Sequence, residues 1–292
     1  MNKLVTLFLG ALLLLVISVM IASAIAFQEE PWAERIAVIP IEGGIVSGRV
    51  MGLGDADAWS IIDSIESADN NPSVKAILIE VNSPGGSPVA SAEIADAIKR
   101  ANKPTVAWIG EVGASGGYWV ASAADKVVAH PMSLTGSIGA YSMVIEAEGL
   151  MEKLGLSQET IKSGEFKDMG TPYRNMTDEE RALFQETVLE IKDQFVDTVA
   201  ENRNLSREAV LKIADGRAFL GTKALKLGLV DSLGSERDAI KLAASLGNTT
   251  TEKTLYYGKT ASPLDALLSQ SSASLGYGIS KGFSSTAGLQ LR

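Results

Sequence analysis

Beyond residue 34, short apolar runs alternate with segments of helical periodicity. The runs with strand character are Arg35–Val46, Val74–Val81, Thr105–Ile109 and Lys126–Ala129. Val74–Val81 is almost continuously apolar, which is typical of a strand buried on both faces. The amphipathic segments between the strands are Ala56–Ala68, Val89–Arg100 and about Ser115–Ala124. This alternation predicts an α/β domain with a mostly parallel sheet and flanking helices.

The pattern becomes helical in the later part of the chain. Thr177 and Glu180 have the spacing of a capping box, with acidic residues in the first turn, and predict a long helix to about Asn202. Ser206 and Ser235 are expected to start two further helices. We expect the folded domain to occupy residues 29–248. Residues 249–292 would form a C-terminal extension, rich in Ser and Gly from about residue 260 and loosely ordered.

The N-terminal segment Leu4–Phe27 is an uncharged apolar run of 24 residues. Because about 20 apolar residues in a helix span a bilayer, residues 1–28 are predicted to form a membrane anchor. The alternative is a cleaved signal peptide, since Ala22-Ser23-Ala24 resembles a cleavage site. Apolar regions of signal peptides usually have about 7–15 residues, which favours the anchor. Lys3 precedes the run and Glu29 follows it, so we expect a single-pass protein of the cell membrane with its main domain on the extracytoplasmic side.

Composition excludes several kinds of chemistry. The net charge of −9 argues against an extended nucleic-acid surface. The absence of cysteine excludes disulfides, thiolate metal sites and a cysteine nucleophile. The single histidine, His130, excludes a two-histidine zinc motif, and no metal-ligand cluster is evident, so no cofactor is expected. A Ser-His-Asp triad would have to use His130, which follows an apolar strand, precedes a proline and is interpreted as structural.

Two glycine-containing segments follow predicted strands. Gly85-Gly86 allows a sharp turn or the close approach of a ligand, and both interpretations stay open. Ser115 lies at the expected start of a helix between small residues. It is either a helix cap or a nucleophile, with the Gly116 amide, and that of Gly86, available to bind an oxyanion. Gly113 and Gly117 have the spacing of a nucleophile elbow, but that mechanism needs a histidine later in the chain than position 130.

A third segment, Ser163–Asp168, contains Lys167. A lysine acts as a base only when its amine is neutral, and burial is what favours the neutral form. Most lysines are solvated, and Asp168 would favour the charged form if it pointed the same way. Local sequence alone therefore makes Lys167 a weak candidate for a general base.

Taken in order, the motifs SPGG, ASGGYWVASAADK, TGSIG, ETIKSGEFKD and DGRAFLGTKALKLGLVDSLG resemble the signal peptide peptidase A family of Ser-Lys peptidases. The resemblance runs from about Arg35 to Ala244. It implies a fold related to Clp protease and crotonase, and cleavage of membrane-associated peptides such as remnant signal peptides. It also implies Ser115 as nucleophile, Lys167 as base, Ser137 as the residue that orients the lysine, and the amides of Gly86 and Gly116 as the oxyanion hole.

Some members of that family contain two tandem copies of the domain, whereas this chain contains one. The short form resembles members that assemble into homo-oligomeric rings, in which serine and lysine come from neighbouring protomers. Peptides, membrane lipid at the N-terminal helix and further copies of the chain are thus the expected partners. The alternatives are a related membrane protease with one specific protein substrate, a crotonase-like acyl-CoA enzyme and a non-catalytic membrane scaffold. Ser87–Ala90 and Gly139–Met143 are the expected pocket walls.

Overall fold

The computed structural model describes residues 12–18, 33–48 and 55–258. Its strands form one sheet, whose main path has the order β2-β1-β3-β4-β5-β8. All neighbouring pairs along this order are parallel, which confirms the predicted α/β class. The strands are β1 (Arg35–Val46), β2 (Ala56–Asp57), β3 (Val74–Gly86), β4 (Thr105–Ala114), β5 (Lys126–Ala129) and β8 (Ser232–Leu233).

Three short strands extend this sheet. β9 (Thr254–Tyr256) pairs in parallel with β1, so the sheet continues past residue 248. β6 (Leu134–Gly136) pairs in parallel with β4 and antiparallel with β7 (Ala218–Leu220). The β6–β7 pair is the antiparallel exception among the described strands.

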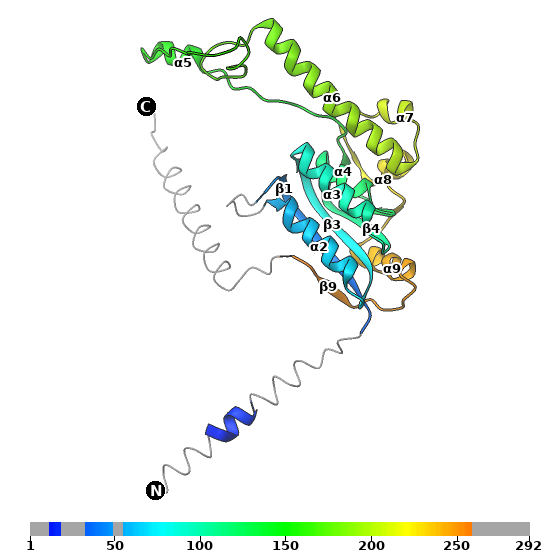
Figure 1. Ribbon diagram of the computed structural model, residues 1–292. Helices are drawn as coiled ribbons and strands as arrows, with labels where there is room; N and C mark the ends of the chain where they lie inside the picture. Colours follow the sequence, from blue (N-terminus) through cyan, green and yellow to red (C-terminus); the bar gives the residue numbers. More distant parts are fainter. Residues whose placement is uncertain (1–11, 19–32, 49–54, 259–292) are drawn as a thin grey trace, which may run out of the picture.

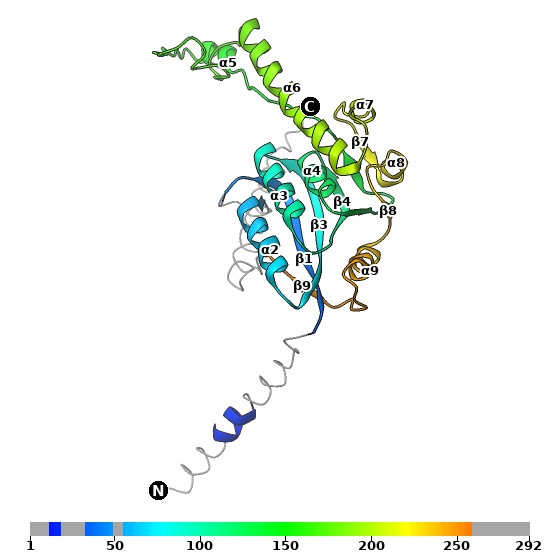
Figure 2. The ribbon, with the colours of Figure 1, turned by 45° about the vertical axis from the view of Figure 1, so that its right-hand side comes forward.

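Helices cover both faces of the sheet, as Figures 1 and 2 show. α2 (Ala58–Asn70), α3 (Pro88–Arg100) and α4 (Gly116–Ser122) lie on one face, and α9 (Glu236–Leu246) lies on the other. Successive residues of a strand point to opposite faces. Ala37 and Ile39 of β1 therefore belong to the core under α2 and α3, while Ile36 and Val38 belong to the core under α9. Burial on both faces explains why these strands read as continuous apolar runs.

The strands that lead to the site are longer than their apolar runs. β1 and β5 have the predicted bounds, but β3 continues beyond Val81 to Gly86 and β4 continues beyond Ile109 to Ala114. The pairing shifts register between Val81 and Ser83, and again in β1 before Gly44. Such irregularities are frequent beside active sites and re-aim the chain. Here they carry Gly85 and the end of β4 to the same edge of the sheet.

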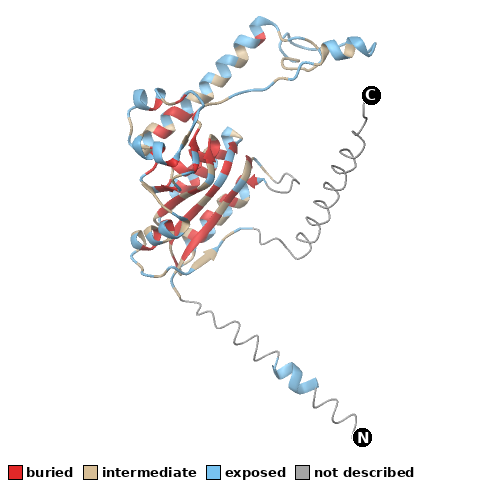
Figure 3. Cartoon of the chain, turned by 180° about the vertical axis from the view of Figure 1, so that it is seen from behind, coloured by how far each residue is buried: buried red, intermediate tan, exposed pale blue. Residues whose placement is uncertain are grey.

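The long helix α6 (Asp178–Arg203) belongs to an arm that projects from the sheet (Figure 1). We define the arm as residues 140–190, which include α5 (Glu148–Lys153). Thr177 and Glu180 form the predicted capping box at the start of α6. Only the second half of α6 packs on the domain, through Phe195, Val196 and Val199. Figure 3 shows that most of the arm is exposed. The arm was not predicted from the sequence.

Two of the remaining helices, α7 (Arg207–Leu211) and α9, begin where the sequence indicates. Ser206 caps α7 and Ser235 caps α9, each by accepting a hydrogen bond from a first-turn amide. α8 (Gly221–Lys226) was not predicted.

The predicted anchor over Leu4–Phe27 lies largely outside the described residues. Its described part, residues 12–18, is helical. In the described ranges we find no helix with the length and apolar character needed to cross a membrane. The expected loose order of residues 260–292 also falls outside the described part of the chain.

Candidate active site

Ser115 connects β4 to α4 in an unusual backbone conformation. Its φ is 52° and its ψ is −125°. A positive φ costs a non-glycine residue about 1–3 kcal/mol, and such strain concentrates at functional sites. Ser115 occupies the position before the first residue of α4, but its side chain makes no capping hydrogen bond. Its N–H donates to the Gly136 carbonyl at 2.8 Å. The half-buried Ser115 instead lines a pocket, so the interpretation of this serine as a helix cap loses its support.

Glycines let the end of β3 approach the start of α4. A methyl group on Gly116 would lie 3.1 Å from the Gly86 nitrogen and 2.3 Å from the Ser91 Oγ. A methyl group on Gly117 would lie 2.5 Å from the Ser83 carbonyl oxygen. Side chains cannot fit at this junction, and the amides of Gly86 and Gly116 are consequently near neighbours. Gly116 begins α4, where N–H groups lack an intrahelical acceptor. The Gly116 amide and that of Gly86, the last residue of β3, lie near Ser115 and can together bind a developing negative charge.

The pocket around Ser115 has a volume of about 830 Å³. One wall is apolar and includes Pro88, Trp119, Ile191 and Phe195. The rings of Trp119 and Phe195 stack with a centroid distance of 4.6 Å and an interplanar angle of 16°. The expected walls are present in part, through Pro88 and Gly139–Tyr141. The wall formed by α6 and by residues 214–216 was not predicted from the sequence, although Ile191 and Phe195 are spaced to share one helix face.

Ser137 also lines this pocket. It has a φ of 53° and its N–H donates to the Arg217 carbonyl. Its Oγ donates to the Gly216 carbonyl at 2.9 Å. The hydroxyl is thereby held at the pocket wall, and its lone pairs can accept a hydrogen bond from an amine. The pocket thus combines Gly86, Ser115, Gly116 and Ser137.

Lys167 does not line this pocket. It lies in the turns between α5 and α6, its N–H donates to the Gly164 carbonyl, and its side chain is exposed. Across the described residues its amine makes no hydrogen bond or ion pair. His130 is likewise not part of the pocket; its Nδ1 accepts the Met132 N–H at 3.2 Å, which fits a structural role at the end of β5. Within one chain, therefore, neither of these two side chains lines the pocket of Ser115, and the lysine that does line it is Lys192 of α6.

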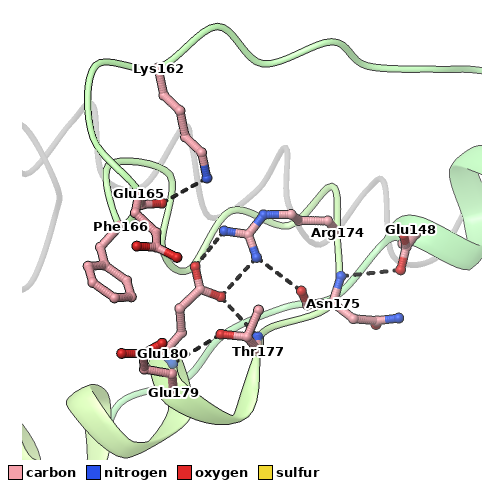
Figure 4. A pocket seen from close by; sticks show the side chains of 9 residues that line it. All are labelled: Glu148, Lys162, Glu165, Phe166, Arg174, Asn175, Thr177, Glu179 and Glu180. Atoms are coloured by element: carbon pink, nitrogen blue, oxygen red, sulfur yellow. Dashed lines mark hydrogen bonds and ion pairs between the residues drawn. The ribbon is translucent and has the colours of Figure 1, made fainter.

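A second pocket, of about 540 Å³, lies in the arm and is shown in Figure 4. Arg174 points into it and binds the carboxylates of both Asp168 and Glu180. The hydrogen bonds from Arg174, with the Thr177 amide, lower the pKa of Glu180 to about 2. Hydrogen bonds from Arg174 and Lys162 hold the pKa of Asp168 well below its usual range. Both carboxylates are therefore charged at neutral pH.

Comparisons with known proteins identify a peptidase family. The family model described as Peptidase family S49 matches residues 97–250, and that of Clp protease matches residues 44–138. The chain is 40% identical to a protein of Methanocaldococcus jannaschii that carries the name "Putative protease", over 77% of this chain and 72% of that protein. It is 37% identical to the "Putative signal peptide peptidase SppA" of Enterococcus faecium, over 67% of this chain and 60% of that protein. With "Protease 4" of Haemophilus influenzae it shares 33% identity over 73% of this chain, which corresponds to 35% of that longer protein.

Proposed function

This chain belongs to peptidase family S49 and is a serine peptidase, and on that premise we propose that Ser115 is its nucleophile and Lys167 its general base. The observation that carries the proposal is the strained backbone of Ser115, which lines a pocket beside the amides of Gly86 and Gly116. A serine held this way has a free hydroxyl and oxyanion donors within reach, which acyl transfer requires.

The mechanism follows from these groups. The Lys167 amine removes the hydroxyl proton while Ser115 Oγ forms a bond to the peptide carbonyl carbon. The Gly86 and Gly116 amides stabilise the resulting oxyanion, each by about 3–4 kcal/mol. The C–N bond then breaks, and the protonated Lys167 gives its proton to the leaving amine. A water molecule, deprotonated by Lys167, hydrolyses the acyl-enzyme. Ser137 would accept a hydrogen bond from the lysine and keep it in line.

We further propose that a second copy of the chain supplies the lysine. Lys167 lies on the projecting arm and outside the pocket that contains Ser115, so an isolated chain leaves the pair apart. The arm also exposes large apolar side chains, among them Tyr141 at 83% and Ile161 at 94%. Exposed apolar surface of this extent favours burial against a partner. A head-to-tail arrangement, in which each arm reaches the next protomer's pocket, would give a closed ring.

The proposed substrates are peptides with small or apolar side chains next to the cut. The apolar wall of Pro88, Trp119 and Phe195 favours such residues. One of the relatives is named as a signal peptide peptidase, which makes remnant signal peptides the proposed natural substrates. The apolar segment Leu4–Phe27 would anchor the enzyme in the cell membrane, with the peptidase domain on the extracytoplasmic side.

The test uses the full chain in detergent with a fluorophosphonate probe and a casein assay. We expect the wild type to be labelled and active, Ser115→Ala to be neither, and Lys167→Ala to lose activity by several orders of magnitude. His130→Ala is the matched control for the base and is expected to cleave normally. Full activity of both Ser115→Ala and Lys167→Ala would refute the proposal. Loss of activity in a folded His130→Ala variant would refute the assignment of the base.

A further inference from the structure

We propose that Arg174 is a positioning residue for the proposed base: it fixes the turn that carries Lys167 to the start of α6 and compensates the negative charge of Asp168. The inference rests on the proposed role of Lys167. Arg174 lies seven residues after Lys167 and outside the motifs, so its position in the sequence does not indicate a role in catalysis.

The guanidinium of Arg174 bridges two carboxylates with two hydrogen bonds each. Toward Asp168, Nε donates to Oδ2 at 3.1 Å and Nη2 donates to Oδ1 at 2.9 Å. Toward Glu180, Nη1 donates to Oε2 at 2.8 Å and Nη2 donates to Oε1 at 2.5 Å. Paired hydrogen bonds of this kind fix orientation as well as distance. Figure 4 shows the planar group lying between the turn and the first residues of α6.

Both ends of this bridge are anchored. Glu180 is only 2% exposed, and its Oε2 also accepts the Thr177 N–H in the capping box. Asp168 follows Lys167 directly, and its carbonyl accepts the Thr171 N–H. Gly170, with a φ of 80°, packs on Phe184 of α6. Arg174 therefore ties the turn that carries Lys167 to α6, and the hydrogen bond from the Lys167 N–H to the Gly164 carbonyl fixes the lysine within that turn.

The bridge also balances charge on the turn that carries Lys167. Asp168 and Glu180 carry two negative charges, and Arg174 and Lys162 carry two positive ones; Lys162 Nζ donates to Asp168 Oδ1 at 2.7 Å. An uncompensated carboxylate on this turn would favour the protonated form of a nearby amine, which is the form that cannot act as a base. With Arg174 in place, the Asp168 charge is already compensated. The charged groups that surround this turn are Lys162, Glu165 and Asp168 on the turn itself, Arg174 on the following loop, Glu148 on α5, and Glu179 and Glu180 on α6.

The two roles can be separated by substitution. Arg174→Gln removes both the bridge and the positive charge, so kcat should fall about tenfold. The midpoint of the acid limb of the kcat/KM profile should also move up. Arg174→Lys keeps the positive charge but cannot make the paired hydrogen bonds of the guanidinium. Its kcat should therefore fall while the midpoint stays near the wild-type value. Asp168→Asn leaves an excess of positive charge, so the midpoint should move down.

The experiment measures kcat/KM of the full-length protein on one fluorogenic peptide between about pH 5 and pH 10. This range includes the pH values at which catalytic lysines lose their proton. Arg181→Gln is the matched control, because Arg181 is an exposed arginine of the same helix start without a described ion pair. It should match the wild type in both readouts.

Opposite shifts for Arg174→Gln and Asp168→Asn would support the inference, since a purely structural role predicts no such pair of shifts. Wild-type midpoints in both variants would overturn it. Arg174→Gln leaves Glu180 buried without a positive partner. If this variant does not fold for that reason, the midpoint of Asp168→Asn and the kcat of Arg174→Lys test the inference without it. Lys167→Ala in the same assay distinguishes a wrong base from a wrong role of Arg174. If Lys167→Ala is active, the proposed base is wrong. If it is inactive while the midpoints of the Arg174 and Asp168 variants stay at the wild-type value, only the role of Arg174 is wrong.

Discussion

Gly85 lies directly against Ser115: a methyl group on Gly85 would stand 2.9 Å from the Ser115 Cβ and 2.6 Å from the Gly116 nitrogen. Gly85 also has a φ of 103°, which disfavours any other residue. The contact sets the spacing between the end of β3 and the start of α4. The two amides proposed to bind the oxyanion, those of Gly86 and Gly116, come from these two elements.

Gly85→Ala should therefore lower kcat by about 100-fold or more, the range seen when one oxyanion donor is lost. The backbone at Gly116 cannot yield as a flexible side chain would, so the amides must move apart. Gly228→Ala is the control, because Gly228 also has a positive φ, of 74°, but its methyl group would meet only the terminal carbons of Leu205. The control should lose about 1 kcal/mol of stability and keep its kcat. Equal kcat values for both variants would contradict the proposed oxyanion hole.

Ser137→Ala tests the residue proposed to orient the lysine. Its Oγ donates to the Gly216 carbonyl and can accept from an amine, so removal of the hydroxyl should lower kcat/KM about tenfold, the value of one hydrogen bond. Thermal unfolding should change little, because Ser137 is only half-buried. Ser142→Ala, an exposed serine of the same segment, should be neutral in both measurements. A Ser137→Ala enzyme with wild-type kcat/KM would exclude the orienting role.

Phe195 is expected to contribute both to the stability of the fold and to the choice of substrate. It is 2% exposed, stacks on Trp119 and lines the Ser115 pocket. Phe195→Ala should cost about 3–5 kcal/mol of unfolding free energy. Phe195→Leu should cost about 1 kcal/mol and raise kcat/KM for bulky apolar residues next to the cut, relative to alanine. Leu189→Ala, on an exposed part of the same helix, is the control for both effects. An unchanged order of preferred residues in Phe195→Leu would remove Phe195 from the specificity pocket.

The C-terminal end of α6 is held by an ion pair between Arg203 and Asp231, and the contribution of this pair to stability depends on pH. Arg203 is 7% exposed and its Nη1 lies 3.0 Å from Asp231 Oδ2, which also accepts the Val127 N–H. Burial raises the pKa of the Asp231 carboxyl, but the hydrogen bonds from Arg203 and Val127 bring it below its ordinary value of 3.8. The carboxylate therefore stabilises the fold above about pH 3.8, and this contribution is lost as the pH falls through the lowered pKa.

Asp231→Asn should consequently reduce the unfolding free energy at pH 7 by about 1–3 kcal/mol. The difference from the wild type should shrink as the pH falls below 4, because the wild-type carboxyl then becomes neutral as well. Thermal unfolding between pH 2.5 and pH 7 measures this, with the exposed Asp193→Asn as control. A difference that stays constant over this range would show that the Asp231 charge is not responsible.

The sheet and its helices were predictable because burial imposes a regular pattern on the sequence. β1 and β5 were bounded correctly since their apolar residues end where their burial ends. The ends of β3 and β4 were missed because Asn82 and Ser83 pair in the sheet through backbone groups, without an apolar pattern. The arm could not be predicted for the opposite reason: its apolar residues, such as Ile145 and Ile161, are exposed in the single chain and follow no helical or strand period.

The candidate site was predictable at its strand ends and not elsewhere. Gly86, Ser115 and Ser137 lie close to parallel strand ends, where open α/β sheets form ligand sites. The wall from α6 depends on how a distant helix docks, which no local pattern encodes. The location of Lys167 outside the pocket could not be read from its motif, because a motif identifies a residue type and not the chain that uses it.

Mixing two inactive variants tests the central claim most directly. Ser115→Ala and Lys167→Ala are each unfolded, combined in equal amounts and refolded together, and peptide cleavage is measured. If each site takes its serine and its lysine from different copies in a head-to-tail assembly, about a quarter of the sites contain both and activity returns to about that fraction of the wild type. If the mixture stays as inactive as its components while the wild type recovers by the same treatment, a dyad shared between copies is contradicted.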